Sequence, residues 1–358
     1  MKGPHGGDIW KASLSSGIRP VDLIDFSSSI NPLGPPKAAK AGFRKSLCFA
    51  GSYPDPEVRG LKNALSGFHK IPAKNILPAN GSTELIYLLP RVLKPKNALI
   101  VGPAFSEYRR SLKLSGCKVF EFILKEKNGF LLDENALIGR LKHRHYGLLY
   151  IGNPSNPLGA LLEKDLLIRL ADVCRDRKTV LVVDEAFIDF SERYSLKKEA
   201  VKSRNIIVLR SMTKFFAMAG LRLGYMVAES GMIKRFSLKL QPWTVNTPAA
   251  MTAIGALSDR EYVKKTLKWL DREKTFLAKG IEAIGGLKPY HSDANYMTVK
   301  ITSAGLDALR LYKALLKKGI LIRPLLDFTG LNKRFFRIAI KKRRENRMLI
   351  RRLKRLCD

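Results

Sequence analysis

Short apolar runs alternate with helical patterns through the middle of this chain, and this alternation restricts the fold more than any other feature. The candidate strands are 98–102, 118–123, 147–152, 179–186, 205–210 and 223–228, and the helical patterns between them are 82–93, 106–115 and 163–176. Several of these strands are continuously apolar, as strands covered on both faces should be. The alternation predicts an α/β unit with a mostly parallel sheet and helices on both sides.

The pattern changes near residue 250. A long helical stretch there leads into two strands and two further helices, at 259–284, 295–301, 306–319, 335–340 and 345–356. The start of the chain is rich in Gly, Pro and Ser, with little helical pattern before 37–47. Because 358 residues are too many for one simple core, we expect three parts. These are an N-terminal arm that joins the small domain (1–45), a large α/β domain (46–250) and a small α+β domain (251–358).

The chain carries 65 basic and 31 acidic residues, which gives a formal net charge of +34. A field of this sign attracts anions in general, so nucleic acid and a phosphorylated small substrate are both candidates. The densest basic cluster, 341–355, keeps apolar residues at helical spacing. That pattern is typical of an amphipathic helix with a solvated basic face. A nucleic-acid-binding regulator is the alternative, but we expect no specific nucleic-acid partner.

Other classes of protein are not expected. No apolar stretch is long enough to span a membrane, and the first ten residues do not resemble a signal peptide. The four cysteines form no C-x-x-C pair and are typical of free thiols in a reducing compartment, so we expect a cytoplasmic protein. His143 and His145 have no acidic or cysteine residue nearby in the sequence, and we expect no metal site.

Four polar segments stand at the carboxyl end of a predicted strand or at the start of a predicted helix. They are GSTE (81–84), NPSNPLG (153–159), DEAF (184–187) and SMTKFFAMAGLRLGY (211–225). Open α/β sheets bind ligands along this edge. The four segments therefore predict one ligand site.

The residues of these segments suit phosphate binding and amine chemistry. Gly81, Ser82 and Thr83 precede a helix, whose free N–H groups can bind a phosphate, although a simple helix cap is an alternative. Lys214 lies among apolar residues, where a lysine can have a lowered pKa and act as a nucleophile. Arg222 follows eight residues later and can reach a phosphate.

Asp184 ends an apolar run, where a carboxylate is costly unless it is paired. In a pyridoxal-5'-phosphate (PLP) site it would pair with the pyridine nitrogen of the cofactor. A carboxylate that caps a turn or binds a metal is the alternative.

The pattern S-x-T-K-x(4)-AG-L-R-L-G-Y, with DEAF and NPSNPLG upstream, resembles the fold-type I PLP enzymes. The resemblance is strongest to the branch of histidinol-phosphate aminotransferases and threonine-phosphate decarboxylases. It implies an aspartate aminotransferase-like fold, a homodimer whose two chains complete each site, and Lys214 as the Schiff-base lysine. It also implies a pyridine-nitrogen contact from Asp184 and a 3'-oxygen contact from Asn156. The implied phosphate ligands are Ser82, Thr83, Ser211, Thr213 and Arg222.

Two aromatic positions stay open within this resemblance. Tyr108 is expected to cover the face of the cofactor ring, with Phe105 as a competitor. The family's usual DEAY reads DEAF here, so Phe187 cannot donate a hydrogen bond to the 3'-oxygen. Tyr225 is a candidate to compensate.

The outer segments resemble the threonine-phosphate decarboxylases of cobalamin synthesis. The similar segments are HGGD (5–8), IDFSSSINPLGPP (24–36), DEAFIDF (184–190) and FRIAIKKRREN (336–346), with Asp8 where an asparagine is common. Histidinol-phosphate aminotransferases usually lack the HGG arm and carry RI-x-x-G-T where this chain has RIAIKK. The resemblance therefore implies decarboxylation of L-threonine O-3-phosphate to (R)-1-aminopropan-2-yl phosphate. A histidinol-phosphate-type aminotransferase and a decarboxylase of L-serine O-phosphate are the alternatives.

The implied substrate contacts lie outside the cofactor motifs. Arg337 would bind the α-carboxylate, because the arginine fork matches a carboxylate in two hydrogen bonds. His5, Asn31 and Arg323 would contact the substrate phosphate or carboxylate, and Asn156 would also face the substrate. Plain structural roles are the alternatives: salt bridges for the two arginines and a turn at Asn31.

Overall fold

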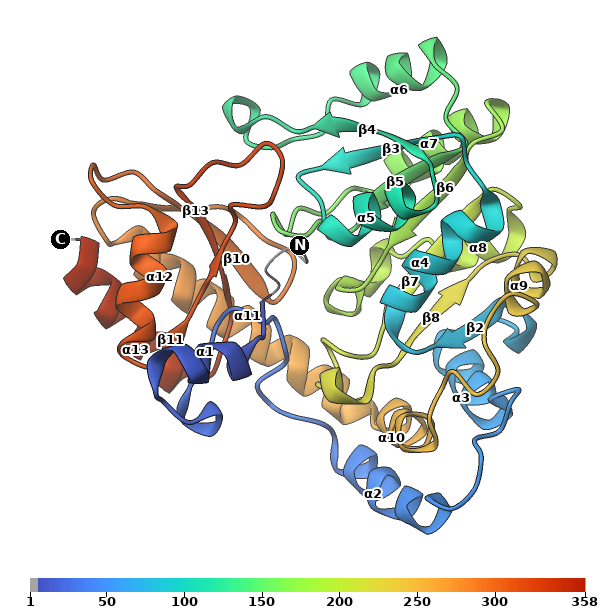
Figure 1. Cartoon of the computed structure of the whole chain (residues 1–358), viewed down its shortest axis with the longest axis horizontal. Helices are drawn as coiled ribbons and strands as arrows, with labels where there is room; N and C mark the ends of the chain where they lie inside the picture. The colour runs from blue at the N-terminus through green and yellow to red at the C-terminus, as the bar shows by residue number, and fades with distance from the viewer. Residues whose placement is uncertain (1–5, 358) are drawn as a thin grey trace.

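The computed structural model describes residues 6–357, and within them seven strands form one large sheet (Figure 1). Their order across the sheet is β2 (Ile76–Ala79), β8 (Gly224–Val227), β7 (Ile206–Ser211), β6 (Val180–Asp184), β5 (Leu148–Gly152), β3 (Asn97–Gly102) and β4 (Lys118–Ile123). All neighbours from β7 to β4 are parallel, and only β8 runs antiparallel to both strands beside it. The predicted mostly parallel sheet is confirmed.

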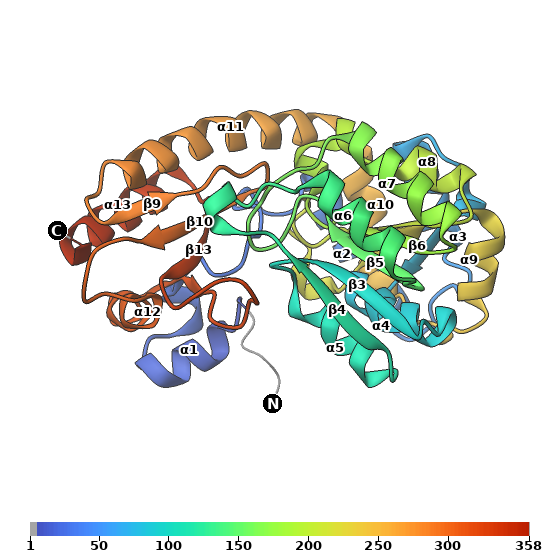
Figure 2. The same ribbon diagram turned by 90° about the horizontal axis from the view of Figure 1, so that it is seen from above.

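Helices cover both faces of this sheet, as Figures 1 and 2 show. One face is covered by α4 (Gly81–Leu93), α5 (Ser106–Leu114) and α9 (Ser230–Ser237), and the other by α3 (Arg59–His69), α6 (Glu134–His143), α7 (Lys164–Asp176) and α8 (Lys197–Lys202). Alternate residues of β6 enter different cores: Leu181 and Val183 join one cluster and Val182 the other. A strand buried on both faces needs continuous apolar residues, which explains the uninterrupted run in the sequence.

The C-terminal part is a smaller α+β unit beside the large sheet (Figure 1). Its antiparallel sheet has the order β12 (Arg323–Pro324), β13 (Phe335–Ala339), β10 (Tyr296–Ile301) and β9 (Leu287–Pro289). The helices of this part are α11 (Arg260–Glu282), α12 (Ala308–Leu316) and α13 (Arg343–Cys357). Figure 2 shows α11 running from beside the large sheet to the small one. These elements match the small α+β unit predicted after residue 250.

The N-terminal segment contacts both parts. Its strand β1 (Ile24–Asp25) pairs in parallel with β11 (Ile320–Leu321), and α2 (Lys37–Ser46) packs against α10 (Thr247–Ser258). Short 3-10 turns complete the described elements: η1 (Pro20–Asp22), η2 (Leu47–Phe49), η3 (Ala73–Asn75), η4 (Glu126–Asn128), η5 (Ile188–Phe190), η6 (Glu192–Tyr194) and η7 (Ala219–Leu221). The division at residues 45 and 250 stays a prediction.

One helix of the arm was not expected. α1 (Ile9–Ser16) lies in the segment where the sequence showed little helical pattern. The Asp8 carboxylate begins it by accepting a hydrogen bond from the Lys11 N–H, and Gly17 ends it in the left-handed conformation. Asp8, which stands where the decarboxylases commonly have an asparagine, is thus a helix cap. Eight residues are too few for a clear periodic signal.

The described residues contain no helix that combines the length and the apolar character needed to cross a bilayer. Among the described residues, Cys48, Cys117, Cys174 and Cys357 form no disulfide.

The start of α4 and strand β8 approach each other at Gly224. A Cβ added to Gly224 would lie 2.3 Å from Ser82 N and 2.8 Å from Arg210 O, which no side chain can occupy without a shift. We expect Gly224→Ala to lower the free energy of unfolding by about 1–3 kcal/mol, because overpacking forces the backbone apart. Gly220→Ala is the matched control, since a Cβ there meets nothing within 4 Å. Equal denaturation midpoints for the two variants would contradict this close approach.

Candidate active site

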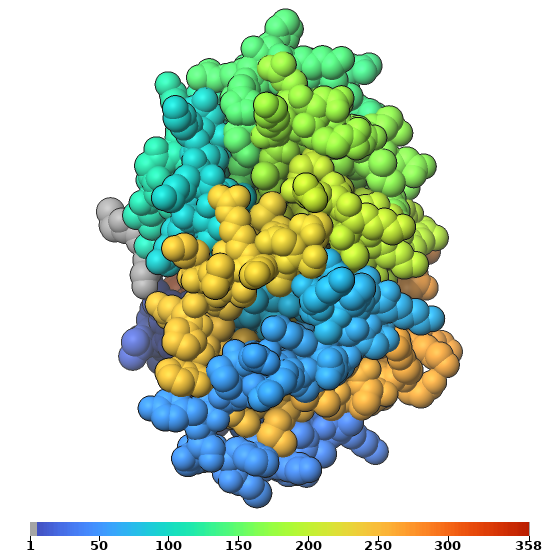
Figure 3. Space-filling view, turned by 90° about the vertical axis from the view of Figure 1, so that its right-hand side faces the viewer, coloured from blue at the N-terminus to red at the C-terminus, as the bar shows by residue number. Residues whose placement is uncertain are grey.

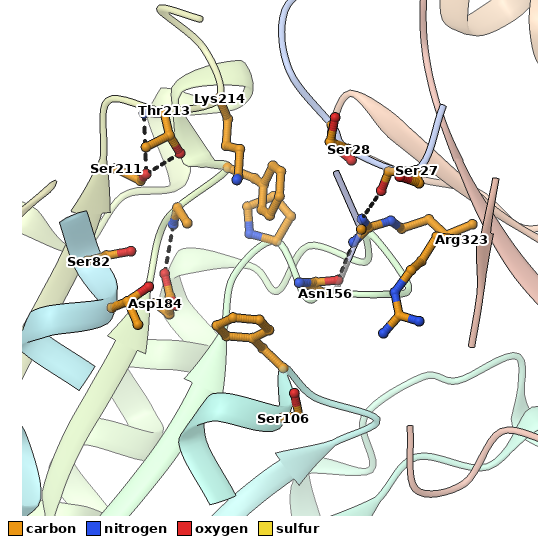
Figure 4. Close-up of a pocket in the computed structure, with 18 of the residues that line it drawn as sticks. Ser27, Ser28, Ser82, Ser106, Asn156, Asp184, Ser211, Thr213, Lys214 and Arg323 are labelled. Carbon is orange, nitrogen blue, oxygen red and sulfur yellow. Dashed lines mark hydrogen bonds between the residues drawn. The ribbon is translucent and has the colours of Figure 1, made fainter. Parts of the chain in front are cut away.

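A cavity lies between the large sheet and the small unit, at the carboxyl ends of β5, β6 and β7 (Figure 4). Most of the predicted site residues line it: Ser82, Thr83, Tyr108, Asn156, Asp184, Ser211, Thr213, Lys214, Arg222, Arg323 and Arg337. Phe105 and Phe187 line it as well. His5 lies outside the described residues. The sheet edge therefore gathers the four motifs, as the strand pattern predicted.

Asp184 ends β6 and faces the cavity with a carboxylate that is already oriented. Its Oδ2 accepts a hydrogen bond of 2.6 Å from the Tyr108 hydroxyl, and its Oδ1 accepts one of 2.9 Å from Ala186 N. Burial raises the pKa of Asp184, and these two hydrogen bonds together with the nearby Lys214 oppose that rise. The carboxylate can accept a further hydrogen bond from a cationic ring nitrogen.

The ring of Tyr108 is less available than predicted. It stacks on Tyr150 with centroids 4.4 Å apart, and its hydroxyl is bonded to Asp184. The neighbouring Phe105 lies edge-on to Tyr108 and lines the same cavity. Both residues predicted to cover the face of the cofactor ring thus line the cavity, and the choice between them stays open.

Lys214 follows β7 and its amine faces the cavity (Figure 4). Burial, together with the positive charges of Arg337 and Arg222, lowers the pKa of the amine to about 8, while Asp184 opposes the shift. A lysine with this pKa carries a larger share of neutral, nucleophilic amine near neutral pH. The predicted reactive lysine therefore has the environment that its chemistry requires.

Hydroxyl groups and a guanidinium gather beside this lysine. Ser211 Oγ and Thr213 Oγ1 lie 2.7 Å apart at the end of β7. Arg222 has a left-handed backbone with φ of +57°, which is uncommon for a residue with a side chain. A Cβ on Gly81 would lie 2.9 Å from Arg222 Nη2, so the glycine leaves room for the guanidinium. Arg222 forms no ion pair with residues 6–357, which suits a phosphate ligand.

Arg337 in β13 faces the opposite side of the cavity. Its Nη1 donates to Asn156 Oδ1 at 2.6 Å and its Nη2 donates to Ser27 O at 2.9 Å. Its Nε is buried without a hydrogen-bond partner, and it forms no salt bridge with the part of the chain described. Burial lowers the pKa of Arg337 to about 10. A buried cation without a counter-ion is costly, so this position calls for an anionic ligand.

The contact with Arg337 also orients Asn156. Because Asn156 Oδ1 accepts from the guanidinium, its NH₂ group is the part left to donate into the cavity. This is the orientation that a hydrogen bond to a cofactor oxygen requires.

Asn31, named from the sequence as a substrate contact, does not line the cavity. The Asn31 side-chain NH₂ donates to Phe215 O, Tyr262 Oη and Thr266 Oγ1 at 2.8–3.0 Å. Its backbone N–H donates to Lys214 O. Asn31 therefore leaves no group for a substrate, and we propose that it positions the Lys214 segment instead.

Tyr225, the candidate to compensate for Phe187, is also occupied elsewhere. Its hydroxyl is bonded to His69 Nε2 at 2.5 Å, and the residue does not line the cavity. The Phe187 ring lies 5.9 Å from Lys214 Nζ and supplies only an apolar wall.

Sequence reasoning missed the serines of the arm. Ser27, Ser28 and Ser29 line the cavity opposite Lys214, with Ser27 and Ser28 drawn in Figure 4. The Asp25 carboxylate accepts hydrogen bonds from both Ser27 and Ser28 and holds them there. The only available signal was the run DFSSS itself, an acidic residue followed by three short hydroxyl side chains.

Comparison with known proteins assigns this chain to a family. The model of "Aminotransferase class I and II" matches residues 21–353. The chain belongs to this family. It is 37% identical to the threonine-phosphate decarboxylase of Salmonella typhimurium over 97% of this chain and 94% of that protein. It is 31% identical to the solved histidinol-phosphate aminotransferase of Clostridium acetobutylicum, with a TM-score of 0.87, covering 93% of this chain and 99% of the other.

A third comparison concerns the cofactor. The solved histidinol-phosphate aminotransferase of Sinorhizobium meliloti, in complex with pyridoxal-5'-phosphate, has a TM-score of 0.88 at 21% identity and covers 99% of this chain and 95% of that one. Enzymes of this family are PLP-dependent, and the predicted aspartate aminotransferase-like fold is confirmed. The cavity fits this cofactor, because it offers a buried carboxylate at Asp184, the amine of Lys214 and, at Arg222, a guanidinium that has no ion pair among residues 6–357. The protein is a PLP-dependent enzyme.

The lowered pKa of Lys214 has a measurable consequence for the apoprotein. The folded state disfavours the ammonium form, so folding carries a cost that is full below pH 8, falls between pH 8 and 10.5, and vanishes above that range. We expect Lys214→Met to raise the free energy of unfolding at pH 7 by about 1–3 kcal/mol. The gain should shrink toward pH 10. Chemical denaturation of both apoproteins at the two pH values measures it.

Lys127→Met is the control, because Lys127 is exposed and its replacement should change stability little at either pH. A Lys214→Met apoprotein that is less stable than the parent at pH 7 would contradict the argument.

Proposed function

We propose that this enzyme decarboxylates L-threonine O-3-phosphate to (R)-1-aminopropan-2-yl phosphate, which serves the nucleotide loop of cobalamin. Identity of 37% to a threonine-phosphate decarboxylase along nearly the whole chain supports the reaction. The observation that carries the substrate class is the buried Arg337, which lacks a counter-ion among residues 6–357, beside a second cavity-lining guanidinium on Arg323. Two cations on one side suit a substrate with two anionic groups.

The cofactor would be held by residues that follow β5, end or follow β6 and β7, begin α4, or precede β8. Asp184 would bond the pyridine nitrogen and Asn156 the 3'-oxygen. The phosphate would be bound by Ser82, Thr83, Ser211, Thr213 and Arg222, with Gly81 allowing the close approach of the arginine. PLP, when bound, supplies a ring that accepts the electrons released at the substrate α-carbon.

On the substrate side, Arg337 would bind the α-carboxylate and fix its direction. Arg323 would bind the phosphate, together with hydroxyl groups of Ser27 and Ser28. Lys214 is the only cavity-lining amine in the described chain, so its Nζ is the group that would deliver a proton to the α-carbon after carbon dioxide leaves. Its pKa of about 8 allows it to hold and release that proton near neutral pH.

The alternative is transamination of a histidinol-phosphate-type substrate. It is favoured by the 31% identity to a histidinol-phosphate aminotransferase of the same fold. Both reactions use the same cofactor residues, so the cofactor side cannot separate them. L-Serine O-phosphate also stays open as a substrate, because one methyl group changes binding by only about 1–3 kcal/mol.

We further propose that the enzyme acts in the cytoplasm as a homodimer. Large apolar side chains are exposed together on the face formed by α2, η2 and the segment before α10, which Figure 3 shows in blue and yellow. They include Phe43, Leu47, Phe49 and the stacked pair Tyr53 and Trp243. Contiguous exposed apolar patches mark interaction sites. Four cysteines without a disulfide among the described residues agree with a reducing compartment.

The reaction is tested by incubating the PLP-loaded enzyme with L-threonine O-3-phosphate and no keto acid. We expect sustained release of carbon dioxide, and none from Lys214→Met. If no carbon dioxide appears, but histidinol phosphate converts the cofactor to its pyridoxamine absorbance, the aminotransferase is the correct assignment.

Arg337 can be tested within the same assay. We expect Arg337→Lys to lower kcat/KM by about 100-fold or more, because a lysine cannot reproduce the two-point contact with a carboxylate or hold Asn156. Arg334→Lys is the control, since Arg334 donates only to backbone carbonyls of Ile301, Thr302 and Ser303. Similar kcat/KM values for the two variants would remove Arg337 from the substrate site.

A further inference from the structure

The guanidinium of Arg323 is already occupied in this structure. Its Nη2 donates to both carboxylate oxygens of Asp327, at 2.8 and 2.7 Å, and its Nη1 donates to Pro324 O at 2.7 Å. The side chains of Arg323 and Asp327 are 8% and 18% exposed, so the ion pair is largely shielded from water. A substrate anion that binds Arg323 must therefore replace the Asp327 carboxylate or share the arginine with it.

Asp327 belongs to a short segment, 325–331, that lies between β12 and β13 of the small sheet and contacts the large sheet. Phe328 of this segment lines the cavity, and Thr329 accepts a hydrogen bond from Arg109 of α5. A Cβ on Gly330, whose φ is +90°, would lie 2.4 Å from Cγ2 of Ile123 in β4. The segment thus packs against the large sheet on one side and supplies the counter-ion of Arg323 on the other.

We propose that Asp327 is a positioning residue. Its carboxylate binds Arg323 where the substrate's phosphate would bind, and it thereby makes the site selective for that phosphate. This proposal rests on the proposed function, because it takes the substrate to be a phosphorylated amino acid. The contact between Asp327 and Arg323 occupies the site until a stronger anion arrives.

The selectivity follows from an exchange of anions. When a ligand carboxylate displaces Asp327, one carboxylate replaces another on the same guanidinium, so little is gained. A phosphate monoester carries about −1.5 to −2 charges at pH 7 and three acceptor oxygens, so it displaces Asp327 with a net gain. An uncharged hydroxyl group cannot displace it at all. Asp327 therefore disfavours the unphosphorylated amino acid and its carboxylate analogues more than the phosphorylated substrate.

The test is Asp327→Asn, which keeps the shape of the side chain and removes the competing charge. We expect the KM for L-threonine O-3-phosphate to fall about fivefold to tenfold, with kcat changed less than twofold. The dissociation constant of inorganic phosphate, measured by calorimetry on the PLP-loaded enzyme, should fall by a similar factor. A residue that only stabilised the fold would not lower either value.

Two further variants separate this mechanism from general charge effects. Asp172→Asn removes a negative charge from a remote surface ion pair with Arg175 and should leave both constants unchanged. In an Arg323→Met background, Asp327→Asn should have no effect on phosphate binding, because Asp327 acts through that arginine.

Phosphate binding also separates this proposal from the proposed reaction. If the parent enzyme releases no carbon dioxide, the decarboxylase assignment fails, while the phosphate titration still tests Asp327. Equal or weaker phosphate binding by Asp327→Asn than by the parent, including no detectable binding by either, would overturn the proposal. The proposal would also be overturned if Asp327→Asn lowered the dissociation constant of phosphate as much in the Arg323→Met background as it does in the parent enzyme.

Discussion

The active site depends on one buried guanidinium that does not touch the cavity. Arg210, near the end of β7, donates to Glu185 at 3.1 Å, to Asp189 at 2.8 Å and to Glu192 at 2.6 Å. Glu185 directly follows Asp184, and Arg210 directly precedes Ser211. The ion cluster therefore joins the ends of β6 and β7 and fixes the spacing of two segments that carry proposed cofactor ligands. Removing one partner from such a buried cluster typically costs about 3–5 kcal/mol.

The acidic groups around Arg210 differ in how readily they ionise. Burial raises the pKa of Glu185 to about 7, which leaves it partly protonated near neutral pH. For Glu192, the attraction of Arg210 and nearby cations outweighs burial and lowers the pKa. Burial also lowers the pKa of His69 to about 4, so this histidine stays neutral. The excess of acidic groups around Arg210 is thereby reduced without a change in the fold.

The sequence was sufficient for the parts of the fold and site that obey a local rule. Continuous apolar runs identified β3, β5 and β6, because strands buried on both faces tolerate no alternation. Asp184 was named because a carboxylate is costly at the end of an apolar run, and Lys214 because its motif resembles the fold-type I PLP enzymes; both line the cavity. Strand β2 escaped, since it has four residues and contains Pro78, which is tolerated only at a sheet edge.

Some parts of the site depend on contacts between segments that are far apart in the chain. No local sequence pattern predicts such contacts. Asn31 was read as a substrate contact, but its amide is used to hold the backbone of the Lys214 segment, more than 180 residues away in the chain. The serines of the arm reach the cavity only because β1 pairs with β11, which brings them opposite Lys214. Arg323 and Asp327 are close in sequence, but the proposed role of their ion pair depends on its position at the cavity between the two parts of the molecule.

The large positive charge of the chain and the cations of the site act over different ranges. On α13, Leu349 and Leu353 are buried while Arg344, Arg347 and Arg351 are exposed, which agrees with the predicted amphipathic helix with a basic outer face. Exposed charges of this kind are screened by salt over about 10 Å, so they influence the rate at which an anionic substrate arrives more than its affinity.

Arg337 is shielded from that solvent and has no carboxylate to give up among residues 6–357, since its hydrogen bonds go to Asn156 Oδ1 and Ser27 O. Arg323 must first release Asp327. Under the proposed function, the affinity and selectivity of the site would follow from these two buried arginines and one aspartate.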